Sequence, residues 1–222
     1  MKLPIPSTFA LKTFVFCLAL IPSVKLALGV AIYPDWLGAN PAEFITRASG
    51  DWTLRFLLLT LAVTPLRKLT GWHALARFRR MLGLYAFFYG TLHLSSYVTF
   101  DHAFDVIEIA RDIVKRPFIT VGFSALLLMV PLAITSTNAM VKRLGAKGWL
   151  ALHKLVYMIA PLGVLHFWWM VKKDVTEPAL YAVLLAALLG YRIAAKLAEH
   201  RRIKPPAGAT ISNVRSMRPR GA

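Results

Sequence analysis

The sequence predicts an all-α integral membrane protein, a bundle of six transmembrane helices with both termini in the cytoplasm. Of its 222 residues, 57% are hydrophobic and 17% are charged, which is more apolar surface than one soluble core of this length needs. The apolar residues form runs near the ~20 residues with which a helix crosses a hydrocarbon core about 30 Å thick. Lys and Arg concentrate between alternate runs, as in a multi-pass membrane protein.

Six apolar runs are the expected spans. In chain order they are Phe9–Leu28, Trp52–Leu66, Met81–Phe100, Phe118–Ser136, Trp149–Val171 and Ala179–Ala198. The second run is shorter than the ideal length. The first run, preceded by Lys2 and Lys12, also has features of a signal peptide, with a weak cleavage site at Ala27-Leu28-Gly29. Removing it would leave an odd number of spans, so we favour a retained helix.

The chain is expected to form one embedded domain, residues 1–200. Residues 201–222 are rich in Pro, Gly and Arg, which predicts a basic, flexible cytoplasmic tail. The single cysteine, Cys17, lies inside the first apolar run. A disulfide framework and a cysteine-held iron–sulfur cluster are therefore excluded, and any redox chemistry must use other ligands.

The charges predict the direction of each span. The segments expected inside hold Lys2, Lys12, Arg67, Lys68, Arg77, Arg79, Arg80, Lys142, Arg143, Lys147, Lys196, Arg201, Arg202, Lys204, Arg215, Arg218 and Arg220. The outer loops hold every acidic residue except Glu199. Trp52, Trp168 and Trp169 would lie at the outer interface and Trp149 at the inner one. The net charge of +17 thus indicates topology rather than nucleic-acid binding.

Three histidines, His93, His153 and His166, lie within expected spans. An ionisable side chain is costly there and needs a partner or a task. The other three, His73, His102 and His200, fall in loops or the tail, and we expect them to be ordinary solvated residues. The intramembrane histidines are therefore the candidate functional residues.

Two of these histidines share a local pattern, Gly90-Thr91-Leu92-His93 and Gly163-Val164-Leu165-His166. A glycine one turn before the imidazole lets a flat macrocycle lie close to the helix while the ring reaches its iron. Glycine also serves plain helix packing in membranes, which stays open as the alternative. His93 and His166 both fall in the outer half of outward-running helices, so they are expected to be level and to clamp one haem.

The third histidine, His153, lies one turn inside the cytoplasmic edge of the fifth run. On an ideal helix it would point about 140° away from His166. Pro161 and Gly163 lie between the two, and a proline permits a kink. We therefore expect a bend in this run.

Several stretches carry a resemblance to a known family. They are Gly50-Asp51-Trp52, Leu54-Arg55-Phe56, Thr64-Pro65-Leu66-Arg67, Arg79 to Leu84, Lys115 to Gly122, Thr135-Ser136 and Trp149 to His153. Together they resemble the MsrQ family, also called YedZ, the haem-binding membrane subunits of bacterial protein-methionine-sulfoxide reductases. The resemblance implies a ferric-reductase-like cytochrome b in the bacterial inner membrane, in contact with membrane lipid.

The resemblance also implies partners. Electrons would pass to a periplasmic molybdopterin subunit, MsrP, which repairs oxidised methionines in envelope proteins. They would come from the quinone pool, or from a cytosolic flavin reductase through bound FMN. Sulfoxide reduction belongs to the partner, so this chain is expected to be an electron-transfer subunit with no catalytic residue of its own.

The resemblance further implies site residues. The family's haem-linked histidines match His93, His153 and His166, and its flavin-linked arginines match Arg79 and Arg80, with Arg77 in support. Related oxidases carry two histidines on each of two helices, whereas the third helix here has only one. One haem b is therefore expected, and a second, involving His153, stays open.

Two other classes of function fit parts of the pattern. Intramembrane histidines also suit a proton-coupled transporter, although that class usually adds carboxylates deep in its spans, which this sequence lacks. The other alternative is a non-catalytic membrane anchor for a soluble enzyme. A reduced cytochrome spectrum would distinguish the favoured interpretation from both.

Overall fold

The computed structural model describes residues 8–203, and this part of the chain is helical and contains no strand. The long helices are α1 (Thr8–Ala31), α2 (Pro41–Thr70), α3 (Arg79–Ser96), α4 (Val106–Lys115), α5 (Pro117–Ile134), α6 (Asn138–Leu152), α7 (Val156–Met170) and α8 (Thr176–Ile203). Four short turns of helix join them, η1 (Pro34–Leu37), η2 (His73–Arg77), η3 (Tyr97–Asp101) and η4 (His153–Leu155). The predicted all-α class is confirmed for the described residues.

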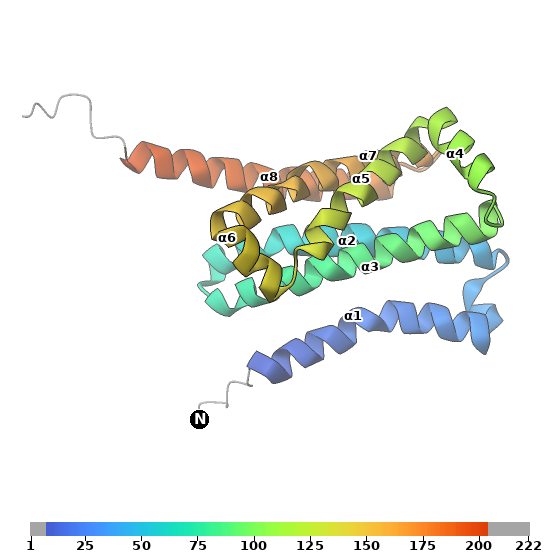
Figure 1. Ribbon diagram of the computed structural model, residues 1–222, viewed down its shortest axis with the longest axis horizontal. Helices are drawn as coiled ribbons and strands as arrows, with labels where there is room; N and C mark the ends of the chain where they lie inside the picture. The colour runs from blue at the N-terminus through green and yellow to red at the C-terminus, as the bar shows by residue number, and fades with distance from the viewer. Residues whose placement is uncertain (1–7, 204–222) are drawn as a thin grey trace, which may run out of the picture.

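The bundle has α2 and α3 at its centre. In Figure 1 this pair lies between α1 on one side and α5, α7 and α8 on the other. Phe56 of α2 stacks on Tyr85 and Tyr89 of α3, with ring centroids 5.4 Å apart in each pair. Leu61, Tyr89 and Ile159 are almost fully buried. Aromatic burial of this kind, worth about 0.5–1.5 kcal/mol per ring pair beyond its area, fixes the central pair.

The first helix is attached to α3 through tyrosine hydroxyl groups. Tyr85 Oη donates to the Phe16 carbonyl at 3.0 Å, and Tyr89 Oη donates to the Ala19 carbonyl at 2.8 Å. Tyr89 Oη also accepts from Ser23 N at 3.1 Å. Ser23 N–H and the Ala19 carbonyl are an i, i+4 pair of α1, so the hydroxyl contacts the backbone of a single turn of that helix.

Four helical segments in the described range are long and apolar enough to cross a membrane. They are Phe9–Ala31, Pro117–Ile134, Asn138–Met170 and Thr176–His200. The chain is thus a membrane protein with several apolar helices. The central helices α2 and α3 are not among the four. In α2, charged residues extend inward as far as Asp51 and Arg55 and reappear at Arg67, which lowers its mean hydropathy.

Two predicted boundaries differ in the structure. The second run extends outward to Pro41, where the Asn40 side chain caps α2 by accepting from Glu43 N at 3.2 Å. The fifth run, Trp149–Val171, stays helical through η4 to Met170, and the non-helical backbone lies before it, at Gly145 (φ 68°, ψ 160°). The predicted outer loop contains an unforeseen helix, α4, whose first turn is capped by Asp105. In the predicted tail, α8 continues to Ile203, and residues 204–222 lie outside the described residues.

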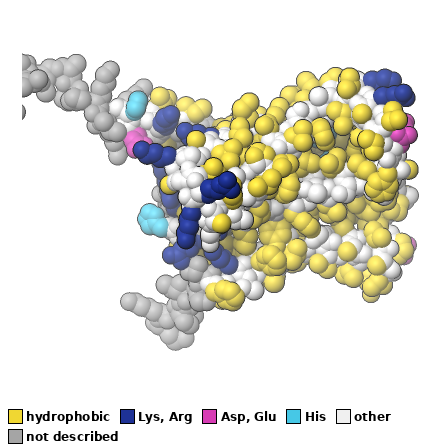
Figure 2. All heavy atoms as spheres, in the orientation of Figure 1, with side chains coloured by type: hydrophobic (Ala, Val, Ile, Leu, Met, Phe, Trp, Pro, Cys, Tyr) yellow, Lys and Arg dark blue, Asp and Glu magenta, His cyan; other side chains and the backbone are white. Residues whose placement is uncertain are grey.

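Charge separates the two ends of the bundle. One end, here called the basic end, holds the end of α2, the start of α3 and helix α6, with Arg67, Arg79, Arg80 and Arg143 among its residues. The opposite, acidic end holds α4 and the loop before α8. Figure 2 shows most of the visible Lys and Arg at the basic end, a smaller group beside Asp and Glu at the opposite end, and hydrophobic side chains over the middle. Apolar surface between two polar ends is what a bilayer requires.

Candidate functional site

Two cavities lie one after the other along the axis of the bundle. The acidic-end cavity, about 270 Å³, is lined by His93 and His166. The basic-end cavity, about 370 Å³, is lined by His153. Leu57 of α2 and Met129 of α5 line both cavities. The structure therefore divides the three predicted histidines between two sites separated by a thin layer of side chains.

His93 and His166 face each other in the acidic-end cavity. Their ring centroids are 6.0 Å apart and the ring planes are inclined by 75°. His93 Nδ1 lies 2.8 Å from the Thr46 carbonyl oxygen, and His166 Nδ1 lies 2.7 Å from the Phe118 carbonyl oxygen. A carbonyl oxygen only accepts, so each Nδ1–H donates. Each Nε2 is then the unprotonated nitrogen, and a backbone partner of this kind orients a metal-binding imidazole.

This spacing fits an iron between the two rings. Metal–imidazole bonds of about 2.0–2.1 Å, with about 1.1 Å from ring centre to nitrogen, hold two opposed rings about 6.3 Å apart. The observed separation is 6.0 Å. The pair thus has the donor type and the spacing with which two imidazoles would hold one haem iron.

Glycines on the neighbouring helices make room for the two rings. A Cβ added to Gly122 of α5 would lie 2.6 Å from His166 Nδ1, closer than real side chains approach. A Cβ at Gly50 of α2 would lie 3.2 Å from His93 Nδ1. The glycines singled out in the sequence, Gly90 and Gly163, line the same cavity. Their nearest neighbours are side chains of other helices. These contacts favour a role for the two glycines in helix packing, the alternative that the sequence left open.

A polar network lies at the mouth of the acidic-end cavity. Asp112 of α4 is buried; it accepts from Tyr97 Oη at 2.8 Å and pairs with Arg116 Nε at 2.8 Å. His102 Nε2 lies 3.3 Å from Asp112 Oδ2. His102 is therefore a half-buried member of a network, and its interpretation as a solvated loop residue was wrong. His73 and His200 are exposed, as expected.

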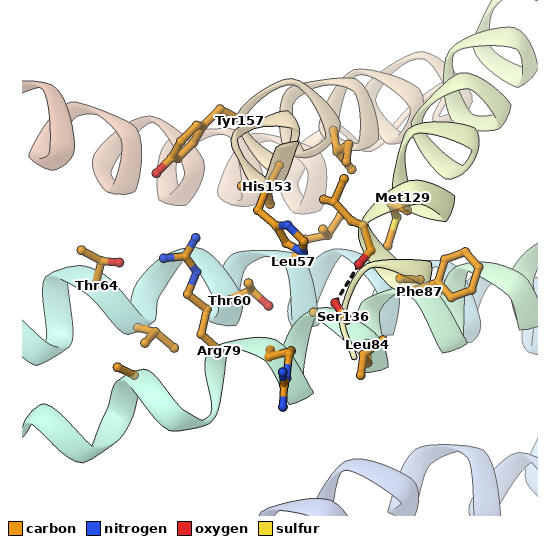
Figure 3. A pocket seen from close by; sticks show the side chains of 18 of the residues that line it. Leu57, Thr60, Thr64, Arg79, Leu84, Phe87, Met129, Ser136, His153 and Tyr157 are labelled. Atoms are coloured by element: carbon orange, nitrogen blue, oxygen red, sulfur yellow. Dashed lines mark hydrogen bonds between the residues drawn. The ribbon is translucent and has the colours of Figure 1, made fainter. Parts of the chain in front are cut away.

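His153 has a different environment. Its ring stacks on Trp149 with centroids 3.8 Å apart, and Nδ1 lies 3.0 Å from the Trp149 carbonyl oxygen. Its Nε2 is buried and has no hydrogen-bond partner in the described part of the chain. Figure 3 shows the His153 ring and the Arg79 side chain directed into the same space. An unpartnered nitrogen of this kind needs an acceptor, a donor or a metal to satisfy it.

The three predicted flavin-linked arginines occupy different positions. Arg79 and Arg80, the first residues of α3, line the basic-end cavity, whereas Arg77 is not among its lining residues. Arg80 Nη1 donates to Asn138 Oδ1 at 2.8 Å. Burial lowers the pKa of the Arg79 guanidinium, and the nearby charges of Arg192 and Arg67 lower it too, whereas Tyr157 raises it. The cavity therefore holds concentrated positive charge.

Sequence reasoning missed several residues of these sites. Thr46 and Phe118 contribute backbone carbonyls, which leave no signal in a sequence. Gly50 and Gly122 lie in two of the stretches that carried the family resemblance, but which helix each faces was unknown. Arg192 is the exception, since an isolated arginine within the apolar run Ala179–Ala198 was a readable signal of a functional position.

Comparisons with known proteins agree with this architecture. Residues 49–164 match the family described as ferric reductase like transmembrane component. The chain is similar to the protein-methionine-sulfoxide reductase heme-binding subunit MsrQ of Herminiimonas arsenicoxydans, at 57% identity over 85% of this chain and 86% of that protein. It is likewise similar to the MsrQ of Polaromonas naphthalenivorans, at 57% identity over 87% and 88%. The MsrQ of Xanthomonas euvesicatoria is 51% identical over 90% and 95%.

Proposed function

This chain belongs to the MsrQ family of heme-binding subunits of protein-methionine-sulfoxide reductases, and we propose that it is a b-type cytochrome that carries electrons across the bacterial inner membrane. The observation that carries the proposal is the His93–His166 pair. Its rings lie 6.0 Å apart, and each Nδ1 is held by a backbone carbonyl. When bound, a haem supplies reversible one-electron transfer.

The residues of the acidic-end cavity bind and orient that haem. Imidazole rings from α3 and α7 supply the two nitrogens, and the Thr46 and Phe118 carbonyls fix the ring orientation. The remaining walls are mainly apolar, including Leu54, Leu126 and Phe167. Two imidazoles in apolar surroundings would hold the haem, and the haem would supply electron transfer there.

The basic-end cavity is the proposed entry point for electrons. Arg79 and Arg80 supply positive charge for FMN, and the unpartnered His153 Nε2 supplies a contact for a quinone, for the flavin or for a second haem. Only the layer with Leu57 and Met129 separates this cavity from the other. The quinone pool, or a cytosolic flavin reductase acting through FMN, is the proposed donor.

The proposed topology has six spans in one domain, residues 1–200, with both termini in the cytoplasm and a basic tail, 201–222. The asymmetry of charge between the two ends of the bundle supports this topology, because segments rich in Lys and Arg are retained on the cytoplasmic side of the membrane. The acidic end then faces the periplasm, where the partner MsrP would accept electrons and reduce methionine sulfoxide.

A haem count tests this function. The purified full-length chain should show an intense Soret band, and sharp α and β bands on reduction, with one to two haems per polypeptide by pyridine haemochrome assay. A proton-coupled transporter or a bare membrane anchor predicts no such bands. A correctly folded, inserted protein that takes up no haem during expression with ample haem would overturn the proposal.

A further inference from the structure

Arg192 of α8 lies in the wall of the basic-end cavity. Its Nη1 donates to Tyr157 Oη at 2.5 Å, and its Nη2 donates to the Leu61 carbonyl. Its guanidinium carbon lies 5.2 Å from the centre of the Tyr157 ring. The Nε atom is buried and has no partner among the described residues. These contacts use two of the five guanidinium donors of a residue that lines the cavity.

The cavity around Arg192 contains positive charge without negative charge. Its lining includes Arg67 of α2, Arg79 and Arg80 of α3 and Arg192 of α8, but no Asp or Glu. Arg79 is close enough to Arg67 and Arg192 to be affected by their charges. Cations gathered from three helices in a partly desolvated space repel one another, so an anion bound among them would relieve that repulsion.

We propose that Arg192, Arg79 and Arg67 bind a phosphate monoester in the basic-end cavity, and that Arg192 is a phosphate-binding residue. The inference rests on the proposed function in identifying the monoester as that of FMN. It differs from a site at the start of α3 built from Arg77, Arg79 and Arg80. Three guanidinium groups lining one cavity suit a phosphate with several acceptor oxygens, which arginine grips bidentately.

A phosphatidate headgroup carries the same monoester chemistry, and simple retention of positive charge at the inner face is the remaining explanation. The test uses the haem-loaded full chain in nanodiscs, titrated with FMN by quenching of flavin fluorescence. The variant is Arg192→Gln. Its matched control is Lys196→Gln, an exposed residue one turn further along α8 that removes the same charge.

The expected result is FMN affinity at least about tenfold weaker in Arg192→Gln, the loss of one charge-assisted hydrogen bond. Lys196→Gln should match wild type. Riboflavin, which lacks the phosphate, should bind weakly and equally to all three proteins, and added salt should weaken FMN binding less in Arg192→Gln. Haem content and the reduced spectrum should be unchanged in every variant, which shows that folding is intact.

Other outcomes overturn the inference. Equal FMN affinity in wild type and Arg192→Gln would mean that Arg192 only helps to set the orientation of the chain in the membrane. If phosphatidate in the nanodisc competes with FMN equally in both proteins, the phosphate site lies elsewhere. If wild type binds no FMN but still carries reducible haem, the inference fails while the proposed cytochrome function stands. Absence of haem in wild type would instead refute the function.

Discussion

At the scale of single residues, the acidic-end site depends on two backbone carbonyls. Thr46 O and Phe118 O each accept from a histidine Nδ1, so both imidazoles present the same nitrogen to the cavity. The tautomer and the ring direction are thus set before any cofactor arrives. Pre-oriented ligands cost less conformational entropy on binding than free rotamers would.

Loss of either imidazole should remove the haem of this cavity. We expect His93→Ala and His166→Ala each to lose most of the reducible haem while remaining inserted, because one axial ligand is missing and the other ring loses its counterpart. The measurement is the reduced-minus-oxidised spectrum of purified protein. His153→Ala, in the other cavity, should alter electron entry instead and keep this signal. Normal spectra in both of the first two variants would contradict the ligand pair.

The glycine beside His166 offers a finer test. In Gly122→Ala the new Cβ would lie 2.6 Å from Nδ1, so the ring must turn or shift. We expect haem to be retained in reduced amount, with altered low-spin EPR g values and a shifted midpoint potential, because the ligand orientation changes. Gly190→Ala is the control, since a Cβ there meets nothing within 4 Å. Identical g values and potential in Gly122→Ala and wild type would show that this contact does not position the ligand.

At the scale of helices, hydrophobic runs predicted the helices well and their interruptions poorly. Long apolar segments identified α1, α5 and α8 to within a few residues. A bend was expected near Pro161, but α7 continues through Pro161 and the non-helical backbone lies at Gly145 of α6, which has a φ of 68°. Proline permits a kink without requiring one, whereas a positive φ favours glycine. The glycine outside the fifth run therefore marks where the chain turns.

The helix α4 is a different kind of omission. Its Asp105 side chain accepts from Ile107 N and Glu108 N at 3.0 Å each, and the Asp-x-x-Glu spacing is a readable start signal. The charge of the surrounding segment, residues 101–116, is typical of a loop and hides this signal. The histidine pair could be predicted, because the depth of each histidine in the membrane follows from the direction of its helix and its residue number along that helix. The supporting glycines and carbonyls could not, because they belong to other helices.

The attachment of α1 gives a prediction at this scale. Tyr89→Phe leaves the Ala19 carbonyl and Ser23 N–H without their hydroxyl partner in a buried position. We expect a loss of about 1–3 kcal/mol in stability, seen as a lower melting temperature by tryptophan fluorescence, with haem content unchanged at low temperature. Tyr33→Phe, at an exposed ring, is the control. An unchanged melting temperature would mean that the Tyr89 hydroxyl group does not stabilise the attachment of α1.

At the scale of the whole molecule, the two cavities and the two charged ends share one axis. The basic end holds a cavity lined with arginines, and the acidic end holds the histidine pair under a network that includes Asp112. With the basic end inside, the proposed haem lies nearer the periplasm and the proposed donor site nearer the cytoplasm. Electron transfer in the outward direction then needs only one short step across the layer with Leu57 and Met129.

The direction of transfer is the last prediction. In right-side-out vesicles containing the reduced chain, MsrP added outside should reoxidise the haem within the mixing time of a stopped-flow experiment, because the proposed topology places the acidic end with α4 in that compartment. Inverted vesicles with MsrP added outside should stay reduced, and a partner lacking its molybdopterin should be inactive in both. The orientation of the vesicles is checked by protease access to the basic tail. Fast reoxidation in inverted vesicles alone would contradict the prediction, because either the acidic end would then lie in the cytoplasm, against the charge pattern, or electrons would leave at the basic end, away from the proposed haem.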